Sequence, residues 1–284
     1  MKRFIITTIA VFMLVTLCVM TFLVFEVVSL QRQVDVLSAK ASVSTDVAES
    51  VEMVDDTYLD TVYQVDDTEN LLEEGEIPLV YLTFDDGPSD NTDRILDILD
   101  DYNVKATFFV VGKDIETYGD QYRRIVDEGH SIGMHSFSHK YSEIYGSSDA
   151  FVSDYQKIHQ LIFDTTGVDS KLYRFPGGSS NSLCNTSMSV FVDYLNSQNV
   201  KYYDWNVDVG DATPAAFSSA EIVDNVMRNV VKYKTSVILM HDASNKDATV
   251  EALPELIEAL QQNGAMILPI TDDTTVIHHT CVVQ

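Results

Sequence analysis

Strands that alternate with helices along the chain predict a parallel α/β architecture. Seven strand–helix steps can be counted after residue 76, and this number favours a barrel over a doubly wound open sheet. The polar motifs follow the predicted strands where these give way to loops, and active sites of α/β barrels lie at that carboxyl edge. With 284 residues and 45% apolar content, the chain has room for one sizeable domain with appendages.

The first predicted strand, residues 77–84, is a buried apolar run that ends at the turn Asp85-Asp86-Gly87-Pro88. A short amphipathic helix is expected over residues 91–102, because its apolar positions fall on one helical face. Further strands are expected over residues 106–111, 130–135, 171–175, 200–205, 236–241 and 265–270. Further helices are expected over residues 121–128, 151–166, 187–198, 219–233 and 249–262.

The amino-terminal region contains a long apolar run. Residues 4–25 carry no charged side chain, and Lys2 and Arg3 precede them. Such a run of more than about 18 residues is typical of a membrane-spanning helix whose basic flank stays in the cytoplasm. We therefore expect a single-pass signal-anchor over residues 4–28 behind a cytoplasmic flank of residues 1–3, with an extracellular catalytic part. The alternative is a signal peptide cleaved near Ala39-Lys40-Ala41, although this sequence lies well past the apolar run.

The formal net charge of −26 is unevenly distributed. Twelve acidic residues and no basic residue lie between Asp46 and Glu76, which predicts an extended, solvated stalk over residues 29–76. The globular domain is expected over residues 77–275, followed by a C-terminal tail of residues 276–284. Because no Lys/Arg stripe is present, the acidity excludes nucleic acid as a partner. Nothing in the sequence indicates an obligate protein partner.

Two adjacent carboxylates, Asp85 and Asp86, end the first predicted strand. Side by side they repel one another, so both stay ionised only if something positive lies near them. A metal held by one carboxylate and a basic side chain beside the other would satisfy this condition. The alternative is an Asx turn that opens the Asp-Gly-Pro sequence, which is common enough to make the dipeptide alone a weak indication.

Two histidines, His135 and His139, follow the third predicted strand with a spacing of four. On a helical turn, residues with this spacing share one face, so both imidazoles can reach one ion. Neutral imidazoles and a carboxylate around an open coordination position describe a hydrolytic metal site. His130 is expected to be structural, and His159, on a predicted helix, is expected to have no partner nearby. A disulfide between Cys184 and Cys281 is left open.

Four motifs occur in a fixed order: Thr83-Phe-Asp-Asp-Gly-Pro-Ser89, His135-Ser-Phe-Ser-His139, Arg174-Phe-Pro176 and Leu239-Met-His241. They resemble the successive motifs of the polysaccharide deacetylase family, the NodB-homology domain of carbohydrate esterase family 4, over roughly residues 77–270. With its expected membrane anchor, the chain is similar to the membrane-anchored peptidoglycan N-acetylglucosamine deacetylases of this family. The resemblance implies a distorted (β/α) barrel with fewer than eight strands. It also implies hydrolysis of N-acetyl groups from amino sugars.

The resemblance assigns roles to the residues of the first three motifs. Asp85 corresponds to the general base, and Asp86, His135 and His139 correspond to the metal ligands. Arg174 would keep Asp85 ionised and oriented by charge pairing. The family implies a divalent metal; zinc is expected, with Co²⁺, Ni²⁺, Mn²⁺ and Fe²⁺ as alternatives.

The last motif supplies the expected proton donor, His241. Asp211 corresponds to the acidic residue that orients this histidine, and Lys105 is expected beside the pair. A carboxylate partner raises an imidazole's pKa and fixes its ring, which a proton donor to a leaving amine needs. Leu239 would help to line the pocket for the acetyl methyl group.

The sequence departs from the family pattern at two positions of the substrate groove. Ala212 stands where the family has a tryptophan, and Gly177 follows Pro176 where many members have an aromatic residue. Pro176 is still expected to contact substrate, and Trp205, the only tryptophan, is expected to wall the groove instead. Both departures leave the reaction intact and the choice of sugar open.

The expected activity is metal-dependent hydrolysis of N-acetyl groups, a reaction at the carbon–nitrogen bond of a linear amide, with release of acetate. An anchored enzyme faces an extracellular acetylated polysaccharide, and N-acetylglucosamine of peptidoglycan is the expected substrate. Alternatives are a chitin-like or poly-N-acetylglucosamine polymer and, less expected, O-acetyl xylan. A catalytically inactive sugar-binding domain and a hydrolase of small non-sugar amides are the competing classes.

Overall fold

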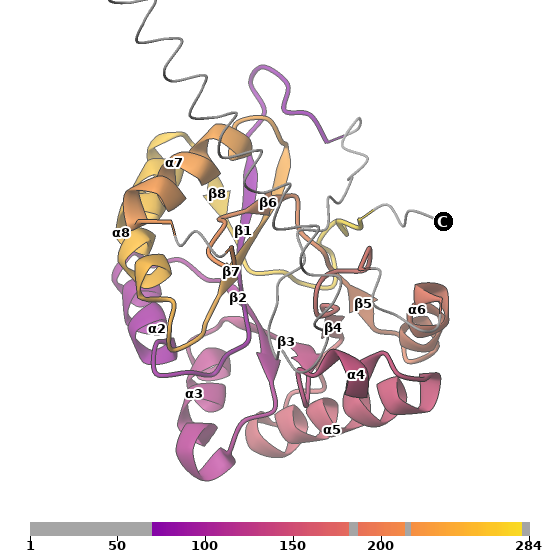
Figure 1. The fold of residues 1–284 in the computed structure, drawn as a ribbon. Coiled ribbons are helices and arrows are strands. Elements are labelled where there is room, and N and C mark those ends of the chain that lie inside the picture. Colours follow the sequence, from indigo (N-terminus) through magenta and orange to yellow (C-terminus); the bar gives the residue numbers. More distant parts are fainter. Residues whose placement is uncertain (1–69, 182–186, 214–216, 280–284) are drawn as a thin grey trace, which may run out of the picture. The chain divides into compact units, whose positions relative to one another are not determined.

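Eight strands form one curved sheet in the computed structural model, which describes residues 70–181, 187–213 and 217–279 (Figure 1). The strands are β1 Leu79–Asp85, β2 Thr107–Val111, β3 Ser131–Ser136, β4 Leu172–Tyr173, β5 Lys201–Tyr202, β6 Val207–Asp208, β7 Thr235–His241 and β8 Met266–Ile267. Seven follow the order β5-β4-β3-β2-β1-β7-β6, and every pairing is parallel. The sheet is a curled half-barrel, so the parallel α/β class is confirmed; its path has the expected seven strands, and β8 adds an eighth.

Strand β8 lies off the seven-strand path. It pairs with Leu79 and Val80 at the start of β1, whereas β2 pairs with β1 from Thr83 to Asp85. The two neighbours thus share one edge of β1, and the carboxyl half of β1 lies between β2 and β7. The sequence analysis counted β8 among its seven strands and missed the two-residue β6.

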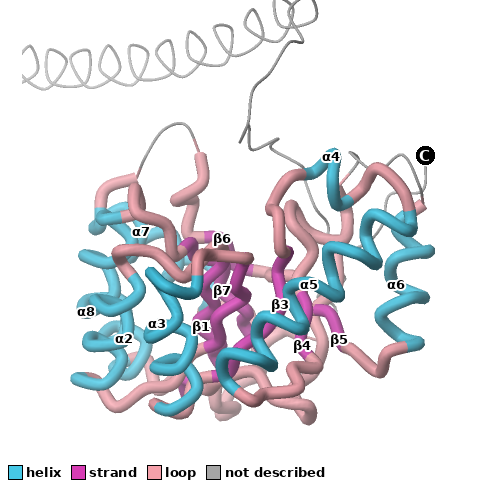
Figure 2. The backbone as a smooth tube through the Cα atoms, turned by 90° about the horizontal axis from the view of Figure 1, so that it is seen from below, coloured by secondary structure: helices cyan, strands magenta, loops and turns pink. Residues whose placement is uncertain are grey.

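The helices lie outside the curved sheet (Figure 2). They are α2 Thr92–Asp101, α3 Ile115–Asp127, α4 Tyr141–Ile144, α5 Ser148–Thr166, α6 Met188–Ser197, α7 Ser219–Val230 and α8 Asp247–Gln262. Helices α2, α3, α7 and α8 group beside β1, β2 and β7, while α5 and α6 lie beside β3, β4 and β5 (Figures 1 and 2). All expected helices are present. However, α3 begins six residues before the expected start, and the single turn α4 was not expected.

Alternation along β1 and β7 separates an outer core from the barrel interior. The residues of β1 that pack against the helices are Val80, Leu82 and Phe84. Tyr81 belongs to the inner cluster, and Leu239 of β7 packs in the same cluster. Thr83 and Asp85 share the face of Tyr81, and His241 shares the face of Leu239. The register pairs Asp85 with His241, so two polar side chains meet at the carboxyl edge of the sheet.

The gap between β5 and β6 is crossed by residues 203–206. Tyr203 N–H donates to Tyr173 O at 2.9 Å, and Asn206 N–H donates to Val237 O at 3.2 Å. Asp204 N–H donates to Ile277 O at 2.9 Å, so the chain beyond residue 275 packs on this crossing. Residues 277–279, expected in the C-terminal tail, thus hydrogen-bond to the domain.

Part of the expected stalk also contacts the domain. The Asn70 side chain donates to Thr235 O at 2.8 Å and accepts from Thr235 N–H at 2.8 Å. Glu76 forms an ion pair with Lys234 at 2.6 Å. The described residues do not include the expected signal-anchor over residues 4–28, the remainder of the stalk, Cys184 or Cys281. Within the described ranges, no helix combines the length and apolarity needed to cross a membrane.

Candidate active site

The residues of the four motifs meet at the carboxyl edge of the half-barrel. Asp85 ends β1, His135 lies in β3, and His241 ends β7. Asp86 follows β1 in a left-handed conformation, with φ of 75°. Parallel strands direct their carboxyl ends to one side, so segments far apart in sequence contribute to one site.

Three side chains with metal-ligating atoms converge there. The ligand atoms of Asp86, His135 and His139 all lie within 4.8 Å of one another. Asp86 Oδ1 is 3.1 Å from His139 Nε2 and 3.6 Å from His135 Nε2. Two imidazoles and one carboxylate form the donor set of a hydrolytic zinc site that keeps a position for water or substrate. The residues present thus fit a divalent ion, and the rest of the described chain holds no other such cluster.

The surroundings of these ligands prepare them for a cation. His135 Nδ1 lies 2.8 Å from Arg174 O; because a carbonyl only accepts, Nδ1 carries the proton and Nε2 keeps its lone pair. Burial lowers the pKa of His135, which keeps this ring neutral. Burial would raise the pKa of Asp86, but the adjacent His139, His241 and His135 hold it well below its usual range.

The loop that carries His139 is fixed by a residue of α5. The expected helical turn is wrong: His135 belongs to β3, and His139 lies in the following loop with φ of 53°. The chain turns back there, which brings the two ring centroids within 5.2 Å. The carboxylate of Asp154 accepts three hydrogen bonds at 2.8–2.9 Å, from Ser136 Oγ, Phe137 N–H and Ser138 N–H. Ser136 Oγ in turn accepts from His139 N–H at 2.8 Å.

Asp85 has a different partner from Asp86. Its carboxylate is 2% exposed and accepts from Arg174 Nη1 at 2.9 Å, while Arg174 itself is fully buried. Three more acceptors satisfy the guanidinium: Thr83 Oγ1 at 2.6 Å, Tyr203 O at 2.9 Å and Asp204 O at 3.2 Å. A charge pair in which four of the five guanidinium N–H donors are used is compatible with burial and holds the carboxylate in one orientation. Asp85 thus has the basic neighbour that the sequence analysis expected, while both carboxylates lie within 3.8 Å of His135 Nε2.

His241 is paired with Asp211 on the other side of the ligands. Its Nδ1 lies 2.7 Å from Asp211 Oδ1, and its backbone N–H donates to Asp211 Oδ2 at 2.9 Å. Thr249 Oγ1 also donates to this carboxylate, at 2.8 Å. Burial would lower the pKa of His241, but the adjacent Asp211 carboxylate outweighs it and raises the pKa to about 10. Nδ1 is held by Asp211, so Nε2 is the atom left to exchange a proton.

Comparisons with known proteins agree with this geometry. Residues 73–191 match the polysaccharide deacetylase family model. A peptidoglycan-N-acetylglucosamine deacetylase of Bacillus cereus is 33% identical over 193 residues, which cover 66% of this chain and 68% of that protein. The chain belongs to the polysaccharide deacetylase family.

Solved structures support the same assignment. The catalytic domain of peptidoglycan N-acetylglucosamine deacetylase from Eubacterium rectale has a TM-score of 0.69 and 39% identity, covering 74% of this chain and 96% of that one. Among the relatives found by sequence, a chitooligosaccharide deacetylase of Sinorhizobium fredii is 31% identical, over 67% of this chain and 89% of that protein. The family's deacetylases hydrolyse N-acetyl amides, and the chain is accordingly a hydrolase of this type.

In this polysaccharide deacetylase, the lysine beside the His241–Asp211 pair is Lys246. Its Nζ donates to Asp211 O at 2.8 Å. Lys105 was expected there, but it precedes β2 and lies beside Gly129, at the amino edge of the sheet. The expectation is wrong, because Lys105 precedes the strand and the site lies at the carboxyl end. His130 has the structural role expected, since its Nδ1 accepts from Ala106 N–H at 3.0 Å.

Asp242 is a buried residue that the sequence analysis did not single out. Its carboxylate accepts from Ser89 Oγ and Thr92 Oγ1, each at 2.6 Å, and burial raises its pKa to about 6. Its backbone N–H donates to Asp85 O at 2.7 Å. A Cβ at Gly87 would lie 2.3 Å from Asp242 Oδ2, so only glycine fits there. Asp242 thereby links the end of β7 to the loop after β1. Its position directly after His241 was the one indication of this role in the sequence.

The expected substrate residues occupy different environments. Leu239 is 2% exposed and lies inside the half-barrel, two residues before His241 on the same face. Pro176 O accepts from Tyr145 Oη at 2.8 Å, which fixes the third-motif loop. Trp205 is 4% exposed and packs against His279, with ring centroids 4.6 Å apart. This interior position argues against Trp205 as the wall of an open groove.

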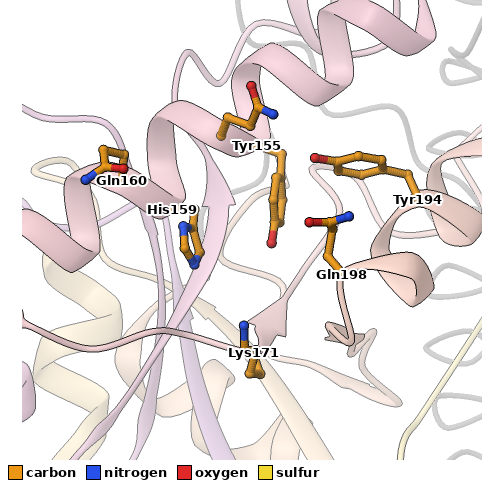
Figure 3. A pocket seen from close by; sticks show the side chains of 7 residues that line it. Tyr155, His159, Gln160, Lys171, Tyr194 and Gln198 are labelled. Atoms are coloured by element: carbon orange, nitrogen blue, oxygen red, sulfur yellow. The ribbon is translucent and has the colours of Figure 1, made fainter.

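A hollow of about 410 Å³ lies on the outside of the deacetylase barrel, between α5 and α6 (Figure 3). Its lining is Tyr155, Gln156, His159, Gln160, Lys171, Tyr194 and Gln198. None of the motif residues lines it, so the catalytic chemistry lies elsewhere. His159 pairs with Asp169 at 2.8 Å, which corrects the expectation that this histidine has no partner nearby.

Proposed function

We propose that the deacetylase removes N-acetyl groups from an extracellular amino-sugar polymer, with peptidoglycan N-acetylglucosamine as the substrate and zinc as the metal. The observation that carries the proposal is that two separately paired proton-transfer residues lie beside the metal-ligand cluster at one edge of the sheet. Asp85 is paired with Arg174, His241 is paired with Asp211, and the metal-ligand cluster lies with them. A base, an acid and a Lewis-acid site at one edge are what amide hydrolysis requires.

Asp86, His135 and His139 would hold the divalent ion. When bound, the ion would polarise the acetamide carbonyl and lower the pKa of a water molecule. Asp85 then accepts the proton of the attacking water, and its pairing with Arg174 keeps it oriented for this. His241 donates a proton from Nε2 to the departing amine, so that acetate and a free amino sugar result.

The negative charge that develops on the carbonyl oxygen also needs a backbone donor. The N–H groups of Phe137, Ser138 and His139 already have acceptors, so the second-motif loop offers none of these. Gly177 N–H has no acceptor within the described part of the chain, and it lies in the third-motif loop. We assign it as the oxyanion donor, a contribution worth about 3 kcal/mol for a well-placed group.

The test is acetate release by the full-length chain from purified peptidoglycan and from an N-acetylglucosamine tetramer, with zinc and after chelation. Asp85→Asn and His241→Ala should each lower kcat by at least about 10²-fold. His159→Ala, which removes a histidine outside the site, should leave kcat unchanged. Wild-type acetate release by Asp85→Asn would show that the proposed base is wrong.

A chitin-like polymer is the second candidate, because a chitooligosaccharide deacetylase is among the relatives. Release from the tetramer alone would favour it, whereas release from peptidoglycan supports the first choice. An inactive sugar-binding domain would bind zinc and glycan without releasing acetate from either. The presence of both proton-transfer residues beside the ligands favours turnover over binding alone.

A further inference from the structure

The third-motif loop leaves space for a side chain from the start of α4. Gly177 has φ of +75°, and a Cβ built on it would lie 2.8 Å from Tyr141 Oη and 3.2 Å from Tyr141 Cε1. A side chain at position 177 and the Tyr141 phenol thus compete for the same space. The ring that the sequence lacks after Pro176 has a spatial substitute at the start of α4.

Tyr141 also lies against the metal-ligand cluster. Its ring centroid is 6.3 Å from that of His139, with the rings at 76°, so an edge-to-face contact joins them. Half-buried, Tyr141 keeps part of its ring at the surface, whereas Tyr145 behind it is fully buried. Tyr145 packs on Tyr141 at 5.8 Å and donates to Pro176 O, so the exposed ring has a fixed support.

We propose that Tyr141 is the aromatic contact for the sugar ring whose acetyl group is hydrolysed, and hence a specificity residue of the groove. This inference rests on the proposed deacetylation of an amino-sugar polymer. A pyranose has an apolar face that packs on an aromatic ring, and its hydroxyls can pair with a phenol. A ring that contacts His139 and lies beside Gly177 would position the sugar next to both residues. A preformed contact of this kind limits the ordering entropy lost on binding.

The test uses the full-length, zinc-loaded chain with Asp85→Asn, so that substrate is bound but not consumed. Calorimetry then measures the Kd of the N-acetylglucosamine tetramer. Tyr141→Ala should raise this Kd at least tenfold, and Tyr141→Phe, which keeps the ring, should raise it threefold or less. Tyr102→Ala is the matched control, because Tyr102 caps the far end of α2 and should leave the Kd unchanged. Zinc content should stay at one ion per chain in all variants.

Gly177→Ala supplies a second arm, since the new Cβ meets the phenol. It should weaken tetramer binding more when Tyr141 is present than in the Tyr141→Ala background. An unchanged Kd in Tyr141→Ala, or a loss of zinc that accompanies the loss of binding, would overturn the sugar contact. If wild type nevertheless releases acetate from glycan, the proposed function still stands. If wild type neither binds the tetramer nor releases acetate from any glycan, the proposed function and this inference fail together.

Discussion

At the scale of single residues, Arg174 determines how two neighbouring carboxylates act differently. It is fully buried, and its guanidinium packs over the Phe109 ring at 4.3 Å. Removing one partner of a buried charge pair leaves the other charge uncompensated. Arg174→Met should therefore lower the free energy of unfolding by about 3–5 kcal/mol, as measured by chemical denaturation.

The companion variant separates charge from packing. Asp85→Asn/Arg174→Met removes both charges, so it should recover part of the lost stability without recovering acetate release. Equal instability of the single and double variants would mean that lost packing, rather than the unpaired Asp85, causes the effect.

The His241–Asp211 pair controls the alkaline side of the pH profile. A general acid works only while protonated, so activity falls as pH rises through the pKa of His241. That pKa is raised to about 10 by Asp211, so the unmodified chain should stay active well above neutral pH. Asp211→Asn removes the raising charge and should move the alkaline limb to lower pH, with kcat lower by about 10²-fold or more.

The measurement is kcat against pH on the tetramer. Asp169→Asn is the matched control, because Asp169 pairs with the half-buried His159 on α5, outside the site, and should not move the limb. An alkaline limb at the same pH in Asp211→Asn would assign that limb to a group other than His241.

At the scale of elements, α5 supports the metal site although it carries no ligand. Its residue Asp154 accepts three hydrogen bonds from the end of β3 and the loop that follows it. Loss of a partner that orients a ligand typically weakens metal affinity by about 10- to 100-fold. Asp154→Ala should weaken zinc affinity to that extent, as measured by competition with a chromophoric chelator. Asp164→Ala, which changes an exposed residue of the same helix, should leave the zinc affinity unchanged. Equal zinc affinities in the two variants would mean that Asp154 and the loop it holds do not contribute to zinc binding.

Long apolar runs made β1 and β7 predictable, because burial on both faces leaves a continuous pattern. Strand β6 has two residues and α4 a single turn, so neither shows a periodicity. The ligand residues were predictable from motif order, but the loop geometry was not. A φ of 53° at His139 depends on Asp154, and Lys246 reaches Asp211 only through the loop after β7. Tertiary contacts thus decide what local sequence leaves open.

At the scale of the whole molecule, the chain end completes the barrel interior. Ile277 is 6% exposed in the inner cluster, next to Trp205, whereas its neighbour Val276 is 38% exposed. Truncation of a buried isoleucine costs about 2–5 kcal/mol, and surface truncations cost about 0.5 kcal/mol or less. Ile277→Ala should therefore destabilise the domain far more than Val276→Ala in chemical denaturation. Equal effects would mean that the chain end contributes no core packing.

We propose that the protein lies at the outer face of the cell membrane, and the amino-terminal apolar run supports this location. As a helix, residues 4–25 would extend about 33 Å, enough for a hydrocarbon core of about 30 Å. Deletion of residues 1–28 should move the chain from the membrane to the soluble fraction, whereas deletion of residues 40–57 should not. The acidic charge from Asp46 to Glu76 cannot substitute for the anchor, because it is repelled by anionic lipid. If the intact mass of the purified protein instead corresponds to a chain that begins near residue 42, the protein is cleaved after Ala41 and secreted.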